Sequence, residues 1–224
     1  PLRLVGSEMC IRDRGNLYQQ QEQYEKSITQ YTKAKAVNSN DEKIHNNLGL
    51  SYFKMKLFEK SLDCYQTAVN INPKYEEAIF GLGNCYDNLG KRNEAIRYFK
   101  EVISLYPKHA RASLNLAQTQ LAIGDFYNGW NNYESRFNKE IPTGSVLPDY
   151  TIPIWDPSKT TSNLIVFAEQ GIGDQILFYS LLHDLKNLNI NLTIMIEEKI
   201  LSIFQRSFPN ISFIIRGADI DEKQ

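Results

Sequence analysis

A short glycine-rich segment that follows a fully apolar run offers the clearest chemistry in this 224-residue chain. Residues 164–168 read Leu-Ile-Val-Phe-Ala, which is typical of a buried parallel strand, and Gly171, Gly173 and Asp174 come shortly after. Glycines between a strand and a helix allow positive φ and the close approach of a ligand. The N–H groups of a helix that opens at Gln175 would attract an anion. Asp174 could act as a general base toward a hydroxyl group, or it could cap that helix.

The same segment matches a dinucleotide-binding loop only in part. That fingerprint requires a third glycine, and Ile176 occupies its place. A nicotinamide site that uses Glu197 to bind the ribose is therefore a weaker alternative. Glu169 and Gln170, which precede the glycines, are better candidates for contacts to an acceptor substrate than for catalysis.

An alternation of apolar runs and helical patterns surrounds this segment. Strands are predicted at residues 164–168, 192–196 and 211–215, with helical patterns at 176–185 and 199–207. This order predicts the first half of a Rossmann-like parallel sheet with right-handed crossovers, over residues 163–224. Residues 139–162 contain four of the eight prolines (Pro142, Pro148, Pro153 and Pro157) together with Gly144, and this composition predicts an extended linker.

A period of 34 residues organises the part of the chain before the linker. Each unit contains two apolar periods of about 3.6 residues separated by a turn, so each unit is predicted to be a helix pair. A small residue lets the two helices of a unit approach closely, and an aromatic residue fills the space between one pair and the next. One pair cannot bury its apolar face alone, so stacked neighbours share a core. The small residues are Gly15, Gly49, Gly83 and Ala117, and the aromatic residues are Tyr31, Tyr65, Phe99 and Tyr133.

This pattern resembles the tetratricopeptide repeat family over residues 15–137. The first unit is partial because Arg14 stands where its leucine belongs, and the fourth has Gln120 in place of tyrosine and Arg136 in place of alanine. Pro73 and Pro107 end two of the units because proline cannot continue a helix. The predicted repeats cover about 15–40, 42–74, 76–108 and 110–138 within a solenoid at 15–138.

The resemblance implies a binding surface, because arrays of this family usually hold a peptide or partner segment on the concave face lined by each first helix. Asn47 and Asn115 resemble part of the asparagine ladder of O-GlcNAc transferase repeats, where side-chain amides bind a peptide backbone. Gly81 interrupts this ladder at the middle repeat. The alternative is that these positions are simply solvated. The predicted peptide contacts are Asn47, Leu50, Phe53, Asn84, Asn115 and Gln118.

A second resemblance joins the repeats to the glycine-rich segment. The stretch 124–137 (GDFYNGWNNYESRF), the Pro-Ile-Trp-Asp at 153–156 and the AEQGIGD at 168–174 together resemble bacterial proteins that fuse repeats to a glycosyltransferase-like domain. That domain is related to the lipopolysaccharide heptosyltransferases, in which a Gly-Asp after the first strand supplies the catalytic base. The resemblance implies that Asp174 is the catalytic base and that Glu169, Gln170, Gly171 and Gly173 bind substrate.

The same resemblance implies how a complete enzyme would work. The first domain would bind the acceptor and a second domain the nucleotide-sugar donor, and sugar would pass to an acceptor hydroxyl. Because the chain stops after three predicted strands, we expect the fragment itself to be inactive and to hold no cofactor. The alternative is a non-catalytic protein-interaction module in which the α/β part is a structural cap or a dimer surface.

Composition narrows the function classes further. Lys and Arg number 25 against 26 Asp and Glu, so the basic surplus typical of nucleic-acid binding is absent. No apolar run approaches the roughly 20 residues that span a bilayer. Three cysteines without paired spacing predict neither a zinc site nor a disulfide framework. We expect a soluble, cytoplasmic, bacterial protein without a metal site.

The N-terminal residues do not fit the repeat pattern. Residues 1–14 contain SEMCIRDR, which resembles translated sequencing-adapter sequence, and a natural disordered N-terminus is the alternative. The sequence as a whole therefore predicts a multidomain α plus α/β protein. A tetratricopeptide-repeat α-solenoid is followed by a truncated Rossmann-like parallel β/α domain.

Overall fold

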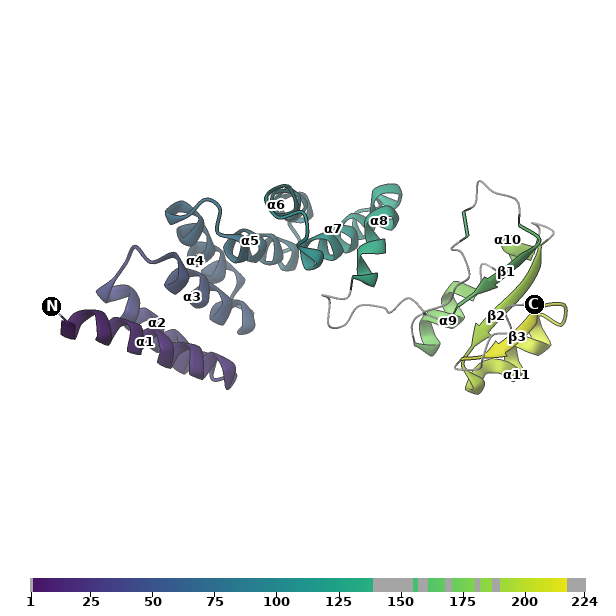
Figure 1. Ribbon diagram of the computed structural model, residues 1–224, viewed down its shortest axis with the longest axis horizontal. Coiled ribbons are helices and arrows are strands. Elements are labelled where there is room, and N and C mark those ends of the chain that lie inside the picture. The colour runs from purple at the N-terminus through teal and green to yellow at the C-terminus, as the bar shows by residue number, and fades with distance from the viewer. Residues whose placement is uncertain are drawn as a thin grey trace. The chain divides into compact units, whose positions relative to one another are not determined.

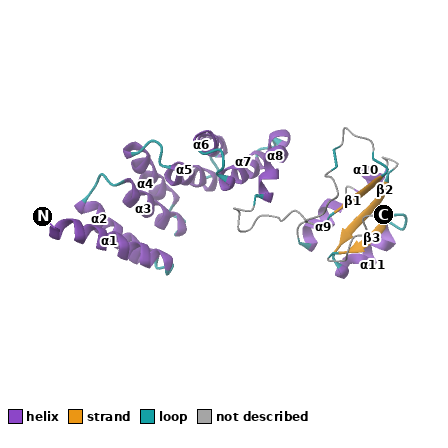
Figure 2. Ribbon diagram, in the orientation of Figure 1, coloured by secondary structure: helices purple, strands orange, loops and turns teal. Residues whose placement is uncertain are grey.

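The computed structural model divides the chain into two compact units, residues 1–142 and 143–224 (Figure 1). The structure describes residues 2–138, 155–156, 161–167, 171–179, 182–186 and 190–216. Most of the predicted linker at 139–162 therefore lies outside the described residues. Figure 2 shows that the helices of the first unit precede a second unit that contains the strands.

Four helix pairs form the first unit, in agreement with the predicted repeats. Short turns connect the two helices of each pair, and the 3₁₀ helix η1 (Glu134–Phe137) follows the last pair. The pairs are α1 (Leu2–Gln20) with α2 (Tyr24–Val37), α3 (Glu42–Lys54) with α4 (Phe58–Ile71), α5 (Glu76–Asn88) with α6 (Arg92–Leu105), and α7 (Ala110–Ala122) with α8 (Phe126–Tyr133).

Each glycine of the 34-residue pattern packs against the aromatic residue of its own repeat. A Cβ atom built on Gly15 would lie 2.5 Å from the Tyr31 ring, and one built on Gly83 would lie 2.6 Å from the Phe99 ring. Both rings are fully buried. The predicted close approach of the two helices is therefore confirmed, because a larger side chain would overlap the ring.

The turn inside each pair contains one residue in the left-handed conformation. Glu22 (φ 58°) and Lys56 (φ 59°) occupy this place in the first two repeats, and Gly90 (φ 75°) and Gly124 (φ 83°) occupy it in the last two. Glycine adopts this conformation freely, whereas a residue with a Cβ atom is strained by roughly 1 kcal/mol. The first two turns thus carry backbone strain that the last two avoid.

Helix α1 begins earlier than the sequence predicts. The first repeat was expected to start at Gly15, with residues 1–14 outside it, but α1 runs from Leu2. Ile11 packs against the first core cluster, and Arg12 forms an ion pair of 3.1 Å with Asp41. The structure therefore differs from the disorder expected for this segment, because its last residues contact the second repeat. Its adapter origin stays a prediction.

The fourth repeat compensates for its missing tyrosine with polar contacts. Gln120, which replaces that tyrosine, is buried and donates to the carboxylate of Asp125 at 3.1 Å. Its carbonyl oxygen accepts from the Asn132 amide at 2.7 Å. These bonds join α7 to the start and the end of α8, so the helix pair forms without the aromatic residue.

A small parallel sheet forms the centre of the second unit. Its three strands lie in the order β1-β2-β3, and they are β1 (Asn163–Val166), β2 (Asn191–Ile196) and β3 (Ser212–Ile215). The register pairs Leu164 with Leu192 and Ile194 with Phe213. This confirms the predicted parallel strands; a complete Rossmann-like domain stays a prediction.

The helices of the second unit cover this sheet with apolar side chains. Between β1 and β2, where the sequence predicts a helix, the described residues include α9 (Ile172–Tyr179) and α10 (Leu182–Lys186). Helix α11 (Glu198–Ser207) connects β2 to β3. The buried core comprises Tyr179, Leu182, Ile194, Ile196, Ile200 and Phe204.

Candidate peptide-binding face

The first helices of neighbouring repeats are joined by pairs of side-chain amides. The Asn47 amide on α3 donates to the side-chain oxygen of Asn16 on α1 at 3.0 Å. The hydroxyl of Tyr31 donates to the same oxygen at 2.7 Å. Loss of hydration on burial raises the pKa of Tyr31 to about 12, so this donor keeps its proton. The first amide pair is therefore held in place from within the repeat core.

An equivalent pair joins the third repeat to the fourth. The Asn115 amide on α7 donates to the side-chain oxygen of Asn84 on α5 at 2.8 Å. The two partners are 31 residues apart in both pairs. A second polar contact accompanies each pair: Gln19 donates to Ser51 at 3.0 Å, and Thr119 donates to Asp87 at 3.1 Å.

The junction between the second and third repeats is apolar instead. Leu50 and Gly81 occupy the positions of the asparagine pair, and both pack in the central core, Leu50 as a half-buried side chain. A Cβ atom on Gly81 would lie 2.5 Å from the Tyr65 ring. Phe53 and Cys85 replace the second polar contact. The ladder is interrupted at this junction because the Tyr65 ring leaves no room for a side chain at Gly81.

These residues together define the first-helix face. It has an apolar centre, Leu50 and Phe53, with one amide pair on each side. A carboxamide can donate and accept at once, and the Asn47 and Asn115 amides each use one of two N–H groups in the pairs described. The members of the first-helix face are Asn16, Asn47, Leu50, Phe53, Asn84, Asn115 and Gln118.

The predicted peptide contacts are thus brought together only in part. Asn47 and Asn115 belong to different junctions and do not form one continuous ladder, and Gln118 is exposed farther along α7. Sequence reasoning missed Asn16, although it lies one 34-residue period before Leu50 and two periods before Asn84. The recurring 31-residue spacing of two asparagine pairs is the signal that could have found it.

The glycine-rich segment of the second unit presents a different environment. Asp174 is exposed and lies in the first turn of α9, so its predicted role as the N-cap is wrong. The helix begins at Ile172, and the Gln175 N–H already donates to the Gly171 carbonyl at 3.0 Å. Gly173 has the right-handed conformation of that helix. Glu169 and Gln170 lie outside the described residues.

Glu197, which would bind the ribose in the alternative nicotinamide site, forms contacts within the protein. Its carboxylate pairs with Arg216 at 3.1 Å, and its backbone N–H donates to the side chain of Gln175 at 3.3 Å. These contacts tie the end of β2 to the start of α9 and to the residue after β3. Glu197 therefore has a structural role at this edge of the sheet.

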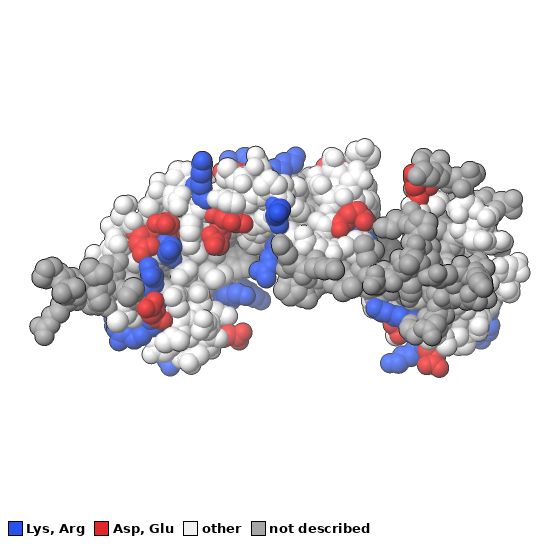
Figure 3. All heavy atoms as spheres, viewed as in Figure 1, with Lys and Arg blue, Asp and Glu red and all other residues white. Residues whose placement is uncertain are grey.

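Acidic and basic side chains are interspersed over the face of the repeats seen in Figure 3. Among the described residues, no group of three or more His, Cys, Asp or Glu side chains is placed to hold a metal ion. No helix within the described ranges has the length and apolar character needed to cross a membrane.

Family models match most of the first unit. The model described as TPR repeat matches residues 15–56, and the model described as tetratricopeptide repeat matches 42–75 and 76–109. Protein FlbA of Caulobacter vibrioides is 32% identical over 97 residues, which are 41% of this chain and 16% of that protein. The chain therefore spans about one sixth of this curated relative.

Solved structures share the fold of the repeats. MamA superposes with a TM-score of 0.56 at 21% identity, over 59% of this chain and 78% of that one. The first TPR of Spaghetti (RPAP3), bound to an HSP90 peptide, has a TM-score of 0.51 at 26% identity, over 52% of this chain and 93% of that one. The helical unit of this chain is therefore an array of tetratricopeptide repeats.

Proposed function

We propose that the first unit is a protein-interaction module that binds an extended peptide segment on the first-helix face. The observation that carries this proposal is the apolar centre at Leu50 and Phe53 between two amide pairs. The RPAP3 repeat domain, which is 26% identical and matched over 93% of its length, is bound to a peptide. That similarity supports the same general role for this chain.

The chemistry of the face suits an extended segment. A peptide in extended conformation leaves backbone N–H and C=O groups unpaired, and carboxamides such as those of Asn84 and Asn115 can bind both kinds of group. An apolar side chain of the peptide would lie against Phe53, where it leaves water. We expect a dissociation constant on the order of 1–100 μM, because ordering the free peptide opposes binding.

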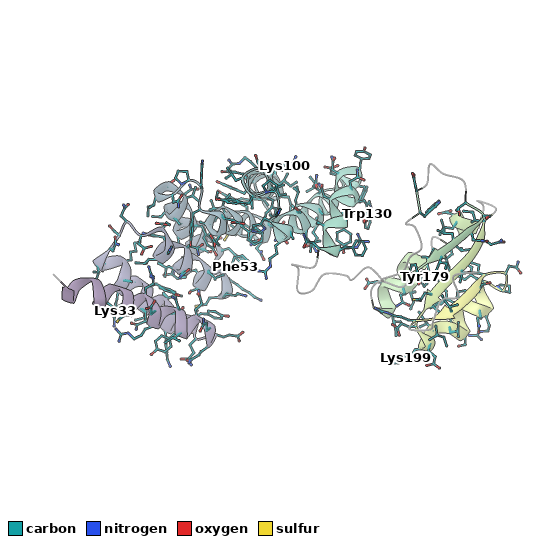
Figure 4. The ribbon with its side chains drawn as sticks, in the orientation of Figure 1. Lys33, Phe53, Lys100, Trp130, Tyr179 and Lys199 are labelled. Carbon is teal, nitrogen blue, oxygen red and sulfur yellow. The ribbon has the colours of Figure 1, made fainter. Side chains whose placement is uncertain are left out.

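A displayed random-peptide library, selected on the full chain, supplies the probe for a test. The enriched peptide is labelled, and its affinity is measured by fluorescence anisotropy. Phe53→Ala should weaken binding by about tenfold or more, since an anchor side chain is lost. Lys100→Ala is the control, because Lys100 is exposed on α6 and lies on the opposite side of the array from Phe53 in Figure 4.

Thermal unfolding separates lost binding from lost folding. Phe53 packs edge-on against Phe58 with ring centroids 5.5 Å apart, so its removal also affects stability. Phe53→Leu keeps an apolar side chain there and removes the ring. If the selected peptides bind Phe53→Ala, Phe53→Leu and Lys100→Ala equally well, the binding surface lies elsewhere and the proposal is refuted.

We also propose, as a second function, that Asp174 serves as the catalytic base of sugar transfer in a longer protein. Supporting observations are the parallel strand β1, the glycine at 173 and the exposure of Asp174 in the first turn of the following helix. An exposed carboxylate at this place can reach an acceptor hydroxyl and take its proton as the oxygen attacks the anomeric carbon of a nucleotide-sugar, while the bond from that carbon to the phosphate oxygen breaks and the nucleotide leaves.

The test requires a version that also contains a donor-binding domain. Asp174→Asn should lower the rate of sugar transfer by about a hundredfold or more while thermal unfolding stays unchanged. Asp184→Asn is the matched control, because Asp184 is an exposed acidic residue on the neighbouring helix α10. Equal rates for the two variants would remove Asp174 from the mechanism.

A further inference from the structure

The last helix of the repeat array exposes a cluster of large apolar side chains. Phe126 is 62% exposed, Tyr127 81%, Trp130 49%, and Ile123 just before α8 is 45% exposed. Trp130 projects from α8 at the end of the array in Figure 4. A contiguous exposed apolar patch of this kind marks an interaction surface more often than it marks a plain solvated face.

The same face is covered in each of the earlier repeats. Trp130 follows Ile28, Leu62 and Ile96 at the 34-residue period. Those three side chains pack against core clusters that include the first helix of the next repeat: the cluster next to Leu62 contains Leu82, and the cluster next to Ile96 contains Leu116. The patch on α8 is thus a continuation of the interface between repeats, and no further repeat helix follows it among the residues that the structure describes.

Head-to-tail stacking of a second copy would not cover this face well. In the array, Ala34 and Leu48 of successive repeats belong to one buried core cluster, and Ala68 and Leu82 belong to another. At the two ends of the array, the equivalent positions hold Arg136 and Arg14. Stacking α1 of one copy on α8 of another would bury Arg14, and Arg136 with its partner Glu134, at a site that is apolar elsewhere, and burying charged groups opposes the contact.

We infer that α8 instead forms a symmetric contact with α8 of a second copy, with the two helices antiparallel. No residue from Phe126 to Tyr133 is charged, so the helices can approach without repulsion. The charged residues next to α8 are held within their own chain, Asp125 by Gln120 and Asn128 and Arg136 by Glu134. With the two-fold axis between residues 130 and 131, Trp130 of each copy lies opposite Asn131 of the other, and the antiparallel helix dipoles attract each other.

The size of the patch sets the strength of the contact. Because an aromatic side chain buries roughly 150–250 Å², the exposed fractions correspond to roughly 400–500 Å² per copy. Two copies would bury roughly 800–1,000 Å², which is in the range of weak, transient interfaces. The dimer is therefore reversible and weak, with a dissociation constant on the order of 10–100 μM.

Sedimentation velocity of the full chain from about 5 to about 500 μM tests this inference. We expect a monomer–dimer equilibrium that Trp130→Ser weakens by about tenfold or more. Ile203→Ser is the matched control, because Ile203 is an exposed apolar residue on α11 (51%) and lies outside the proposed contact. Association that responds equally to both variants would place the contact elsewhere.

Disulfide trapping tests the register independently. Asn131 is exposed and lies beside the proposed two-fold axis, so Asn131→Cys in a Cys10→Ser background should give a covalent dimer on oxidation. Glu94→Cys, exposed on α6, should not. A monomer at every concentration would refute the inference and indicate that a different partner covers α8, and open-ended oligomers would indicate head-to-tail stacking instead.

Discussion

A Cβ atom added to Gly81 would lie 2.5 Å from Cζ of Tyr65. Gly49 approaches the same ring from the same repeat, where an added Cβ would lie 3.0 Å away. Tyr65 is therefore packed between two glycines of successive repeats. This contact explains why the second and third repeats meet through Leu50 and Phe53, whereas the neighbouring junctions use asparagine pairs.

Replacement of Gly81 by alanine should destabilise the array. We expect a loss of about 1–3 kcal/mol in the free energy of unfolding, because the new methyl group overlaps a buried ring. Tyr65→Leu removes the ring, so Gly81→Ala should cost much less in that background. Urea unfolding of the four proteins of this cycle gives the coupling energy. A coupling near zero would contradict the proposed contact.

The strained turns offer a stabilising substitution. Lys56→Gly should raise the free energy of unfolding by about 0.5–1 kcal/mol, because glycine adopts φ near 59° without strain. Gly90→Ala is the matched reverse change. No atom lies within 4 Å of the added Cβ, so only the backbone φ of 75° at this position opposes the methyl group. It should lower stability by a similar amount. Thermal unfolding measures both, and shifts of the same sign would refute this explanation.

The asparagine pair between the third and fourth repeats should show energetic coupling. Asn84→Ala and Asn115→Ala each break the 2.8 Å hydrogen bond, so the double variant should lose less stability than the sum of the single variants. We expect a coupling of about 0.5–1.5 kcal/mol. Asn84→Ala combined with Gln118→Ala is the control cycle, since Gln118 is exposed. Equal coupling in the two cycles would show that the hydrogen bond contributes nothing.

The two buried thiols should make the protein sensitive to alkali. Loss of hydration on burial raises the pKa of Cys64 and of Cys85 from 9.0 to about 11. As the pH rises, the thiols of the unfolded chain lose their protons before those of the folded protein. The stabilisation of the folded state is therefore complete below pH 9 and is lost as the pH rises through 11. Each thiol should lower the free energy of unfolding by at most about 1.4 kcal/mol per pH unit in this window.

Urea unfolding at pH 8, 9, 10 and 11 is the corresponding measurement, in steps of about one unit. Cys85→Ala should reduce the slope, because one of the two ionising thiols is removed. Alkylation by iodoacetamide followed by mass spectrometry gives a second readout: Cys10, which is exposed, should react well before Cys64 and Cys85. Equal labelling of all three cysteines in the folded protein would contradict the burial of the last two.

The sequence by itself determined the architecture of the first unit. The 34-residue period predicted the helix pairs. The small residue and the aromatic residue that recur in each unit, such as Gly83 and Phe99, predicted that the two helices of a pair approach closely. The strands of the second unit were also predicted to within two residues. These features can be predicted because the spacing of apolar residues indicates which face of a helix or strand is buried. In the repeats, the same spacing recurs in every unit.

The tertiary structure alone decided which side chains are partners. Asn16 pairs with Asn47 across 31 residues, so its partner depends on how far one repeat is offset from the next. The start of α9 at Ile172 placed Asp174 inside the first turn, and the ring of Tyr65 excluded a side chain at Gly81. A repeating pattern fixes the buried face of each helix. The contacts between helices depend on the offset and on the volume that each neighbour occupies, and these arise only when the repeats are stacked.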